Sequence, residues 1–221
     1  VEPPKKLDPA TAYSTNEHIY TGSVYGTLLE YHFLKRPLEL MPSLATAMPE
    51  AIDLGDGRTR YRFELRPDLY FHDDPCFELG GAGRRTRLIT MADVAFELAR
   101  IADPKVSSPV TDPFSHIEGF QDFTKRLLER READPAFAAR PAHEQYAEVG
   151  PIAGVATPSS HVLEITLAKP YPQILYWFAM QFSSPVPWEA IQYYDGREGR
   201  DRFDDHPVGS GPFQITRYDK R

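Results

Sequence analysis

Residues 55–67 read GDGRTRYRFELRP and predict a tight turn followed by a half-buried strand. Tyr61, Phe63 and Leu65 alternate with charged side chains, which is the period of two expected of a strand with one buried face. The glycines of the turn place a partner strand just before it, within residues 47–54. Because a shift of one residue would expose all three apolar side chains, we expect Phe63 to point into the core.

Further patterns predict a mixed fold of short helices and strands around this hairpin. Thr90 and Asp93 form a capping-box pattern before an apolar stripe, which predicts a helix over residues 91–101. Alternation over residues 163–167 predicts a second strand. Other helices are expected at residues 17–34, at residues 122–146 with a break at Asp134 and Pro135, and at residues 173–181.

Charge and apolar content exclude some classes of function. The 25 Lys and Arg residues against 32 Asp and Glu residues give a net charge of -7, which has the wrong sign for binding a polyanion. We therefore expect no nucleic-acid partner. No run approaches the roughly 20 apolar residues that a membrane-spanning helix needs. The single cysteine, Cys76, excludes an internal disulfide and a thiolate metal cluster.

An imidazole stands beside two carboxylates at His72, Asp73 and Asp74. These groups are of the kind that acid–base hydrolysis or a metal site requires. Adjacent residues of an extended chain point to opposite faces, so the three side chains converge only in a special turn. The competing interpretation, which we favour, is a turn in which Asp73 or Asp74 caps backbone amides next to Pro75.

Several short segments occur in an order that resembles one protein family. The most specific are the hairpin at residues 56–67 with Phe71-His72-Asp73 after it, and the glycine-proline turn at residues 206–213. The others are Leu7-Asp8-Pro9, residues 24–31 as a first helix, residues 42–45 and residues 89–96. Together they resemble the family 5 extracellular solute-binding proteins, which serve peptide and nickel ABC importers. The loop after His72 and the charged residues 125–146 depart from the family pattern as enlargements.

The resemblance implies an α/β fold of mixed sheets, similar to class II periplasmic binding proteins. Residues 1–34 and 206–221 would belong to the first lobe, and residues 35–205 would form an inserted subdomain. The second lobe would be absent from this chain, and a signal segment would have been removed before Val1. A periplasmic or extracytoplasmic location is implied, and a lipid anchor on the full-length protein is compatible with it.

The function implied by the resemblance is capture of a small ligand, an oligopeptide or dipeptide, for delivery to an ABC transporter permease. A monomer without cofactor, metal or catalytic residues is expected. The alternatives are a hydrolase or metal-binding protein that uses His72, Asp73 and Asp74, or a non-catalytic interaction module. Whether the ligand is a peptide, a nickel chelate or a sugar stays open.

Four residues are the candidates for ligand contact. Ser14, Thr15 and Asn16 follow the opening motif and offer polar groups to the backbone of a ligand. Helix capping is the competing role for these three residues. Aromatic residues gather at residues 171–182, where helical spacing favours core packing, whereas Trp188 lies beyond them as the more exposed candidate.

Overall fold

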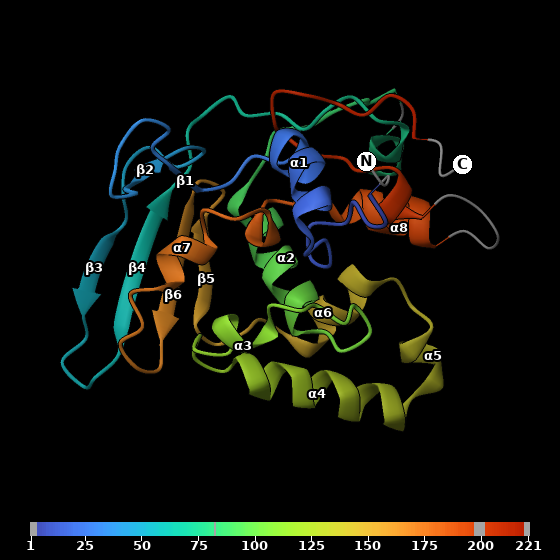
Figure 1. Cartoon of the computed structure of the whole chain (residues 1–221). Coiled ribbons are helices and arrows are strands. Elements are labelled where there is room, and N and C mark those ends of the chain that lie inside the picture. Colours follow the sequence, from blue (N-terminus) through green and yellow to red (C-terminus); the bar gives the residue numbers. More distant parts are fainter. Residues whose placement is uncertain (1–3, 82, 197–201, 219–221) are drawn as a thin grey trace.

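The predicted hairpin forms one half of a four-stranded antiparallel sheet in the computed structural model of the chain (Figure 1). The structure describes residues 4–81, 83–196 and 202–218. The strands lie in the spatial order β3 (Glu50–Asp53), β4 (Thr59–Glu64), β6 (Val162–Leu167) and β5 (Val155–Ser159). Both predicted strands and the predicted partner strand are therefore confirmed.

The register of β4 is the predicted one. Phe63 lies opposite Leu163 of β6, and its exposed fraction is 0%. Tyr61 and Leu65 are also buried, whereas Arg62 faces solvent between them. The apolar face of the hairpin thus forms part of the core, as the alternation requires.

The helix α2 (Met91–Ala102) packs against β5 and β6. Its start is capped as predicted, because the Asp93 carboxylate accepts hydrogen bonds from the amide (2.8 Å) and the hydroxyl (3.0 Å) of Thr90. A layer of helices follows at the lower edge of Figure 1 and consists of α3 (Thr111–Phe114), α4 (Phe120–Ala133), α5 (Pro135–Ala138) and α6 (Ala142–Val149). The predicted break at Asp134 and Pro135 lies between α4 and α5.

The helix predicted over residues 17–34 is confirmed over residues 17–24 and wrong beyond Val24. The helix α1 covers only Thr15–Val24, and the chain then forms β1 (Leu29–Tyr31), which pairs with β2 (Leu40–Pro42). The Val24 carbonyl accepts a hydrogen bond from the Gly211 amide instead of continuing the helix (2.7 Å). The apolar residues after Val24 therefore lie in a turn and a strand. The prediction that residues 24–31 form a first helix is wrong for the same reason.

The remaining elements are short. The predicted helix at residues 173–181 is a single turn, α7 (Ile174–Trp177), followed by the 3-10 helix η2 (Gln181–Ser183). The others are η1 (Pro75–Gly80), α8 (Trp188–Asp195) and η3 (Phe203–Asp205). No helix in the described part of the chain is long and apolar enough to cross a membrane.

The end of α1 lies beside the glycine-proline turn near the other end of the described chain. The Gly209 backbone approaches α1 so closely that a Cβ atom there would lie 2.1 Å from the Val24 carbonyl oxygen, which explains why glycine occupies this turn. The Ser210 hydroxyl accepts a hydrogen bond from the Gly26 amide (3.3 Å). These contacts join the described parts of residues 1–34 and 206–221, and one apolar core connects them with the sheet.

Candidate functional site

A short polar ledge precedes and begins α1, and it contains three of the four candidate residues. We define the α1 ledge as Tyr13, Ser14, Thr15 and Asn16. Ser14 is the N-cap of α1, and its hydroxyl accepts a hydrogen bond from the Glu17 amide (3.3 Å). Ser14 and Thr15 are exposed and Asn16 is half-buried. The predicted capping role is thus confirmed for Ser14, while the side chain of Thr15 faces solvent.

The buried Glu17 holds the ledge in place from below. Its carboxylate accepts hydrogen bonds from the amides of Tyr13 (2.9 Å), Ser14 (2.9 Å) and Lys6 (3.1 Å). Burial acts to raise the pKa of Glu17, but the hydrogen bonds from Ser14, Tyr13 and Lys6 outweigh it and lower this pKa. The carboxylate is therefore ionised at neutral pH and fixes the backbone of the ledge.

Gln181 braces the ledge from the other side. Its amide donates to the Ala12 carbonyl (3.0 Å), and its oxygen lies 2.9 Å from Nδ1 of His18 on α1. The exposed Tyr13 ring lies 5.9 Å from the buried Phe182 ring, measured between centroids. The sequence contains no local signal for Gln181, because its partners lie more than 160 residues away.

Trp188 lies in a different part of the molecule from these contacts. It begins α8, is half-buried, and packs against the His143 ring of α6 at 4.1 Å between centroids. Burial lowers the pKa of His143, although Glu144 and Glu189 act in the opposite direction. The ring of Trp188 thus packs on α6, whereas the aromatic ring of the ledge, Tyr13, packs on Phe182.

His72, Asp73 and Asp74 do not form a common site. The His72 Nε2 atom lies 2.7 Å from the Gly211 carbonyl oxygen, so the imidazole braces the glycine-proline turn. Asp74 caps η1 by accepting a hydrogen bond from the Cys76 amide (2.8 Å), as the turn interpretation predicts. Among the described residues, no group of three or more His, Cys, Asp or Glu side chains is arranged to hold a metal ion.

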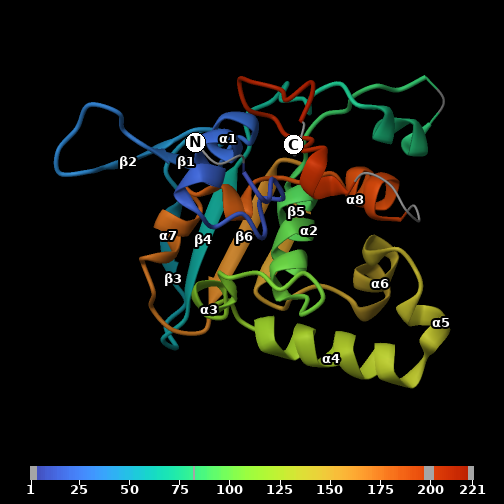
Figure 2. The ribbon, with the colours of Figure 1, turned by 45° about the vertical axis from the view of Figure 1, so that its right-hand side comes forward.

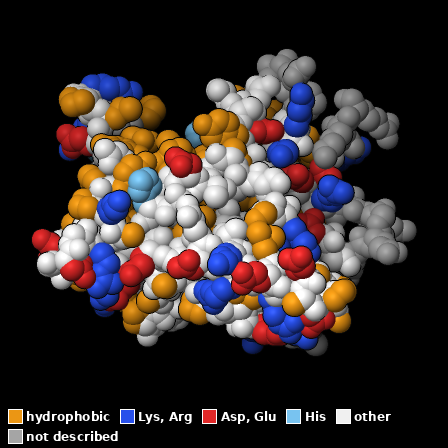
Figure 3. Space-filling view, turned by 90° about the horizontal axis from the view of Figure 1, so that it is seen from below, with side chains coloured by type: hydrophobic (Ala, Val, Ile, Leu, Met, Phe, Trp, Pro, Cys, Tyr) orange, Lys and Arg blue, Asp and Glu red, His pale blue; other side chains and the backbone are white. Residues whose placement is uncertain are grey.

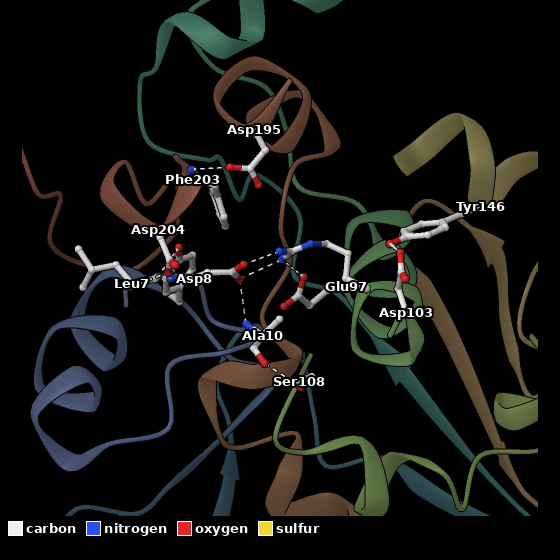
Figure 4. Close-up of polar contacts among 12 residues, drawn as sticks. Leu7, Asp8, Ala10, Glu97, Asp103, Ser108, Tyr146, Asp195, Phe203 and Asp204 are labelled. Atoms are coloured by element: carbon white, nitrogen blue, oxygen red, sulfur yellow. Dashed lines mark hydrogen bonds and ion pairs between the residues drawn. The ribbon is translucent and has the colours of Figure 1, made fainter. Parts of the chain in front are cut away.

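A buried ionic network lies around Arg100 (Figure 4). The Arg100 guanidinium of α2 donates to both carboxylate oxygens of Asp8 (3.0 and 2.5 Å) and to Glu97 (2.7 Å). Asp204 accepts hydrogen bonds from the amides of Leu7 (3.1 Å) and Asp8 (2.9 Å). The network thus joins the opening motif, α2 and the segment before the glycine-proline turn.

A hollow of about 1090 Å³ opens beside this network. Residues of both charges line it. The basic ones include Lys6, Lys105 and Arg202, and the acidic ones include Asp195 and Asp204. Burial raises the pKa of Asp195 and of Asp204. The sequence motif contained Asp8, but nothing in it indicated Arg100 as the partner of Asp8.

We expect the stability of the chain to fall as the pH rises through the titration of Glu97. Burial raises the pKa of Glu97 from 4.5 to about 8, although Arg100 acts against this shift. Between pH 4.5 and about 8, the folded chain keeps a proton on Glu97 that the unfolded chain has already released. The folded state is therefore most favoured at the lower end of this window and loses stability as the pH rises through it. Denaturant titrations below, within and above the window measure this loss.

The variant Glu97→Gln is expected to reduce the slope of stability against pH across the same window. Asp8, Arg100 and Tyr25 lie around Glu97, and this variant leaves all three residues unchanged. Part of the slope will remain, because the raised pKa values of Asp195 and Asp204 act with the same sign. An unchanged slope in Glu97→Gln would contradict the assignment to Glu97.

Comparisons with known proteins agree with the fold described above. The family model of the bacterial extracellular solute-binding proteins, family 5 Middle, matches residues 39–221. The probable ABC transporter periplasmic-binding protein SapA of Escherichia coli (strain K12) is 27% identical over 202 residues, which are 90% of this chain and 31% of that relative. The chain thus spans between about a quarter and a third of the length of the curated relatives it matches.

Two solved structures illustrate the likeness of fold. The ABC transporter-associated periplasmic binding protein DppA from Helicobacter pylori, in complex with peptide STSA, has a TM-score of 0.65 and 21% identity, over 99% of this chain and 36% of its own. A periplasmic oligopeptide-binding protein from Borrelia burgdorferi has a TM-score of 0.66 and 20% identity, over the same shares of the two chains. The predicted fold class is therefore confirmed. Because the family model covers most of the sequence, this chain belongs to the bacterial extracellular solute-binding proteins of family 5.

Proposed function

We propose that the chain contributes to a binding protein that captures peptides outside the cytoplasmic membrane and delivers them to an ABC transporter permease. The observation that carries the proposal is the family match over residues 39–221. The names of the similar proteins support the finer statement, since they include a periplasmic protein of an ABC transporter and a binding protein in complex with a peptide. A non-catalytic role follows from the same proposal.

The α1 ledge is the proposed contact surface for the ligand. The hydroxyl and amide groups of Ser14, Thr15 and Asn16 are suited to pair with the backbone of a peptide. Glu17 holds the ledge backbone at Tyr13 and Ser14, and Gln181 holds the preceding residue Ala12, so little conformational freedom remains to be lost on binding. Trp188 stays in the proposal as an aromatic contact that acts independently of the ledge.

The proposed division of the chain makes this surface one side of a cleft. Residues 1–34 and 206–221 would be parts of a first lobe, with residues 35–205 as its inserted subdomain, and the ligand would lie between this unit and a second lobe. Binding sites for small molecules bury about 70–90% of the ligand surface. A peptide on one open face keeps much of its surface in water.

We expect this chain alone to fold and to bind peptides much more weakly than the same chain continued over the length of its relatives. Calorimetry of both forms against one mixture of di- to pentapeptides measures the difference. In the longer form, Thr15→Ala is expected to weaken binding about three- to tenfold, which is the effect of one hydrogen bond of typical net strength. Thr46→Ala is the matched control, because Thr46 is also exposed and lies outside the ledge.

Each result of this experiment separates two parts of the proposal. Equal affinities of the short and long forms would refute the two-lobe argument and leave the peptide function standing. Equal effects of Thr15→Ala and Thr46→Ala would refute the ledge as the contact surface. Absence of peptide binding by the long form would refute the proposed function itself.

A further inference from the structure

The loop between β1 and β2 carries the most exposed apolar side chains of the described residues. We call residues 32–39 the hairpin tip. Phe33 is 87% exposed, Leu34 77% and Leu38 53%. Figure 2 shows this loop projecting away from the body of the molecule, beyond the edge of the sheet. Its apolar groups therefore lie on a projecting part of the surface.

The hairpin tip is an ordered element. The His32 amide donates to the Glu39 carbonyl (2.8 Å) and so extends the pairing of β1 with β2 into the loop. Within the loop, the Leu34 amide donates to Nδ1 of His32 (3.2 Å), and the Arg36 guanidinium donates to the Lys35 carbonyl (2.7 Å). These bonds hold the backbone that presents the apolar side chains to solvent.

Basic groups accompany the apolar groups on the hairpin tip. Lys35 and Arg36 follow Phe33 and Leu34 directly, and the tip contains one acid, Glu39, which pairs with Lys35 (2.6 Å). Two cations and one acid leave the tip with an excess of one positive charge, in a chain whose net charge is -7. Seen from below, hydrophobic and basic side chains gather on a projection of the surface (Figure 3).

This combination suits a lipid surface better than a protein pocket. Large apolar side chains that project from a convex loop can enter the boundary between headgroups and acyl chains, while adjacent Lys and Arg side chains interact with anionic headgroups. A lipid surface needs no shape complementary to the loop, whereas a protein partner would have to supply a pocket of matching shape. The projecting position leaves the rest of the acidic molecule away from the membrane.

We propose that the hairpin tip docks on the surface of a membrane that contains anionic phospholipids, with Phe33 and Leu34 inserted and with Lys35 and Arg36 at the headgroups. The proposal rests on the extracytoplasmic location proposed above, which puts the protein next to such a surface. Docking of this kind is weak and reversible, because the inserted apolar area is small. It would keep the protein close to a membrane-embedded partner.

Vesicle co-sedimentation of the purified chain tests the docking. We expect binding to vesicles of phosphatidylcholine and phosphatidylglycerol, weaker binding to pure phosphatidylcholine, and a loss of affinity as salt is raised. The double variant Phe33→Ser, Leu34→Ser should lower the partition constant at least about tenfold, since the inserted apolar groups are removed. The variant Leu128→Ser, which removes an exposed leucine on α4, is the matched control and should bind as the unmodified chain does.

Three results would overturn the proposal. The first is that the unmodified chain does not bind anionic vesicles. The second is that the double variant binds these vesicles as strongly as the unmodified chain does. The third is that the double variant differs from the unmodified chain only by a loss of self-association, measured by sedimentation velocity without lipid. Thermal unfolding of each variant verifies that the fold is intact. Peptide calorimetry is independent of lipid, so failure of docking and failure of the proposed function are told apart.

Discussion

Replacement of Phe63 by alanine is expected to lower the free energy of unfolding by about 3–5 kcal/mol, the usual cost of truncating a fully buried phenylalanine. The side chain has an exposed fraction of 0% in the centre of the sheet, opposite Leu163. Its ring lies 5.0 Å from the Phe178 ring between centroids, so truncation removes an aromatic contact as well as apolar burial. The truncation would leave a cavity between the sheet and the residue that follows α7, Phe178.

Arg62 provides the matched control for this measurement. It directly precedes Phe63 on the same strand but lies on the solvent face, where it pairs with Glu164 (2.9 Å). Exposed ion pairs of this type contribute about 0–1 kcal/mol, so Arg62→Ala should be far less destabilising than Phe63→Ala. Denaturant unfolding curves of the two variants give both values. Equal, small losses would contradict the register of β4.

Local patterns were sufficient to predict the central part of this fold. The alternation around Phe63 encodes its own register, because a one-residue shift would move every apolar side chain to the solvent face. The capping of α2 is equally local, since Thr90 and Asp93 are three residues apart. Elements of this kind can be read from one sequence because the residues that stabilise them are neighbours in the chain.

Elements that depend on distant partners were not predictable in this way. The end of α1 at Val24 is stabilised by Gly211, and nothing near Val24 in the sequence announces that contact. The apolar residues after it fit a helix and a strand about equally well, so their spacing does not distinguish the two. The same limit applies to the ledge: a polar run was visible at Ser14, whereas its support from Gln181 was not.

The Arg100 network is the extreme case of such distant pairing. Arg100 is 92 residues from Asp8 in the sequence, yet the two groups form a paired, buried contact. Glu97 also accepts a hydrogen bond from this guanidinium, so three titratable groups share one buried site. Attraction between buried charges offsets their loss of hydration only while every member is present. Replacement of one member and replacement of all three should therefore differ in their effect on the free energy of unfolding.

Replacement of Arg100 by methionine is expected to destabilise the fold by about 3–5 kcal/mol, because Asp8 is then left buried without its cation. The triple variant Arg100→Met, Asp8→Asn, Glu97→Gln removes the ion pair of Arg100 and Asp8 together with the titratable group of Glu97. We expect it to recover most of this loss, since complete replacement of a buried ion group is often close to neutral. Denaturant titrations of the single and triple variants at one pH give the comparison. If the triple variant were as unstable as the sum of its single replacements, the three groups would act independently, and the description of Asp8, Glu97 and Arg100 as one coupled network would be wrong.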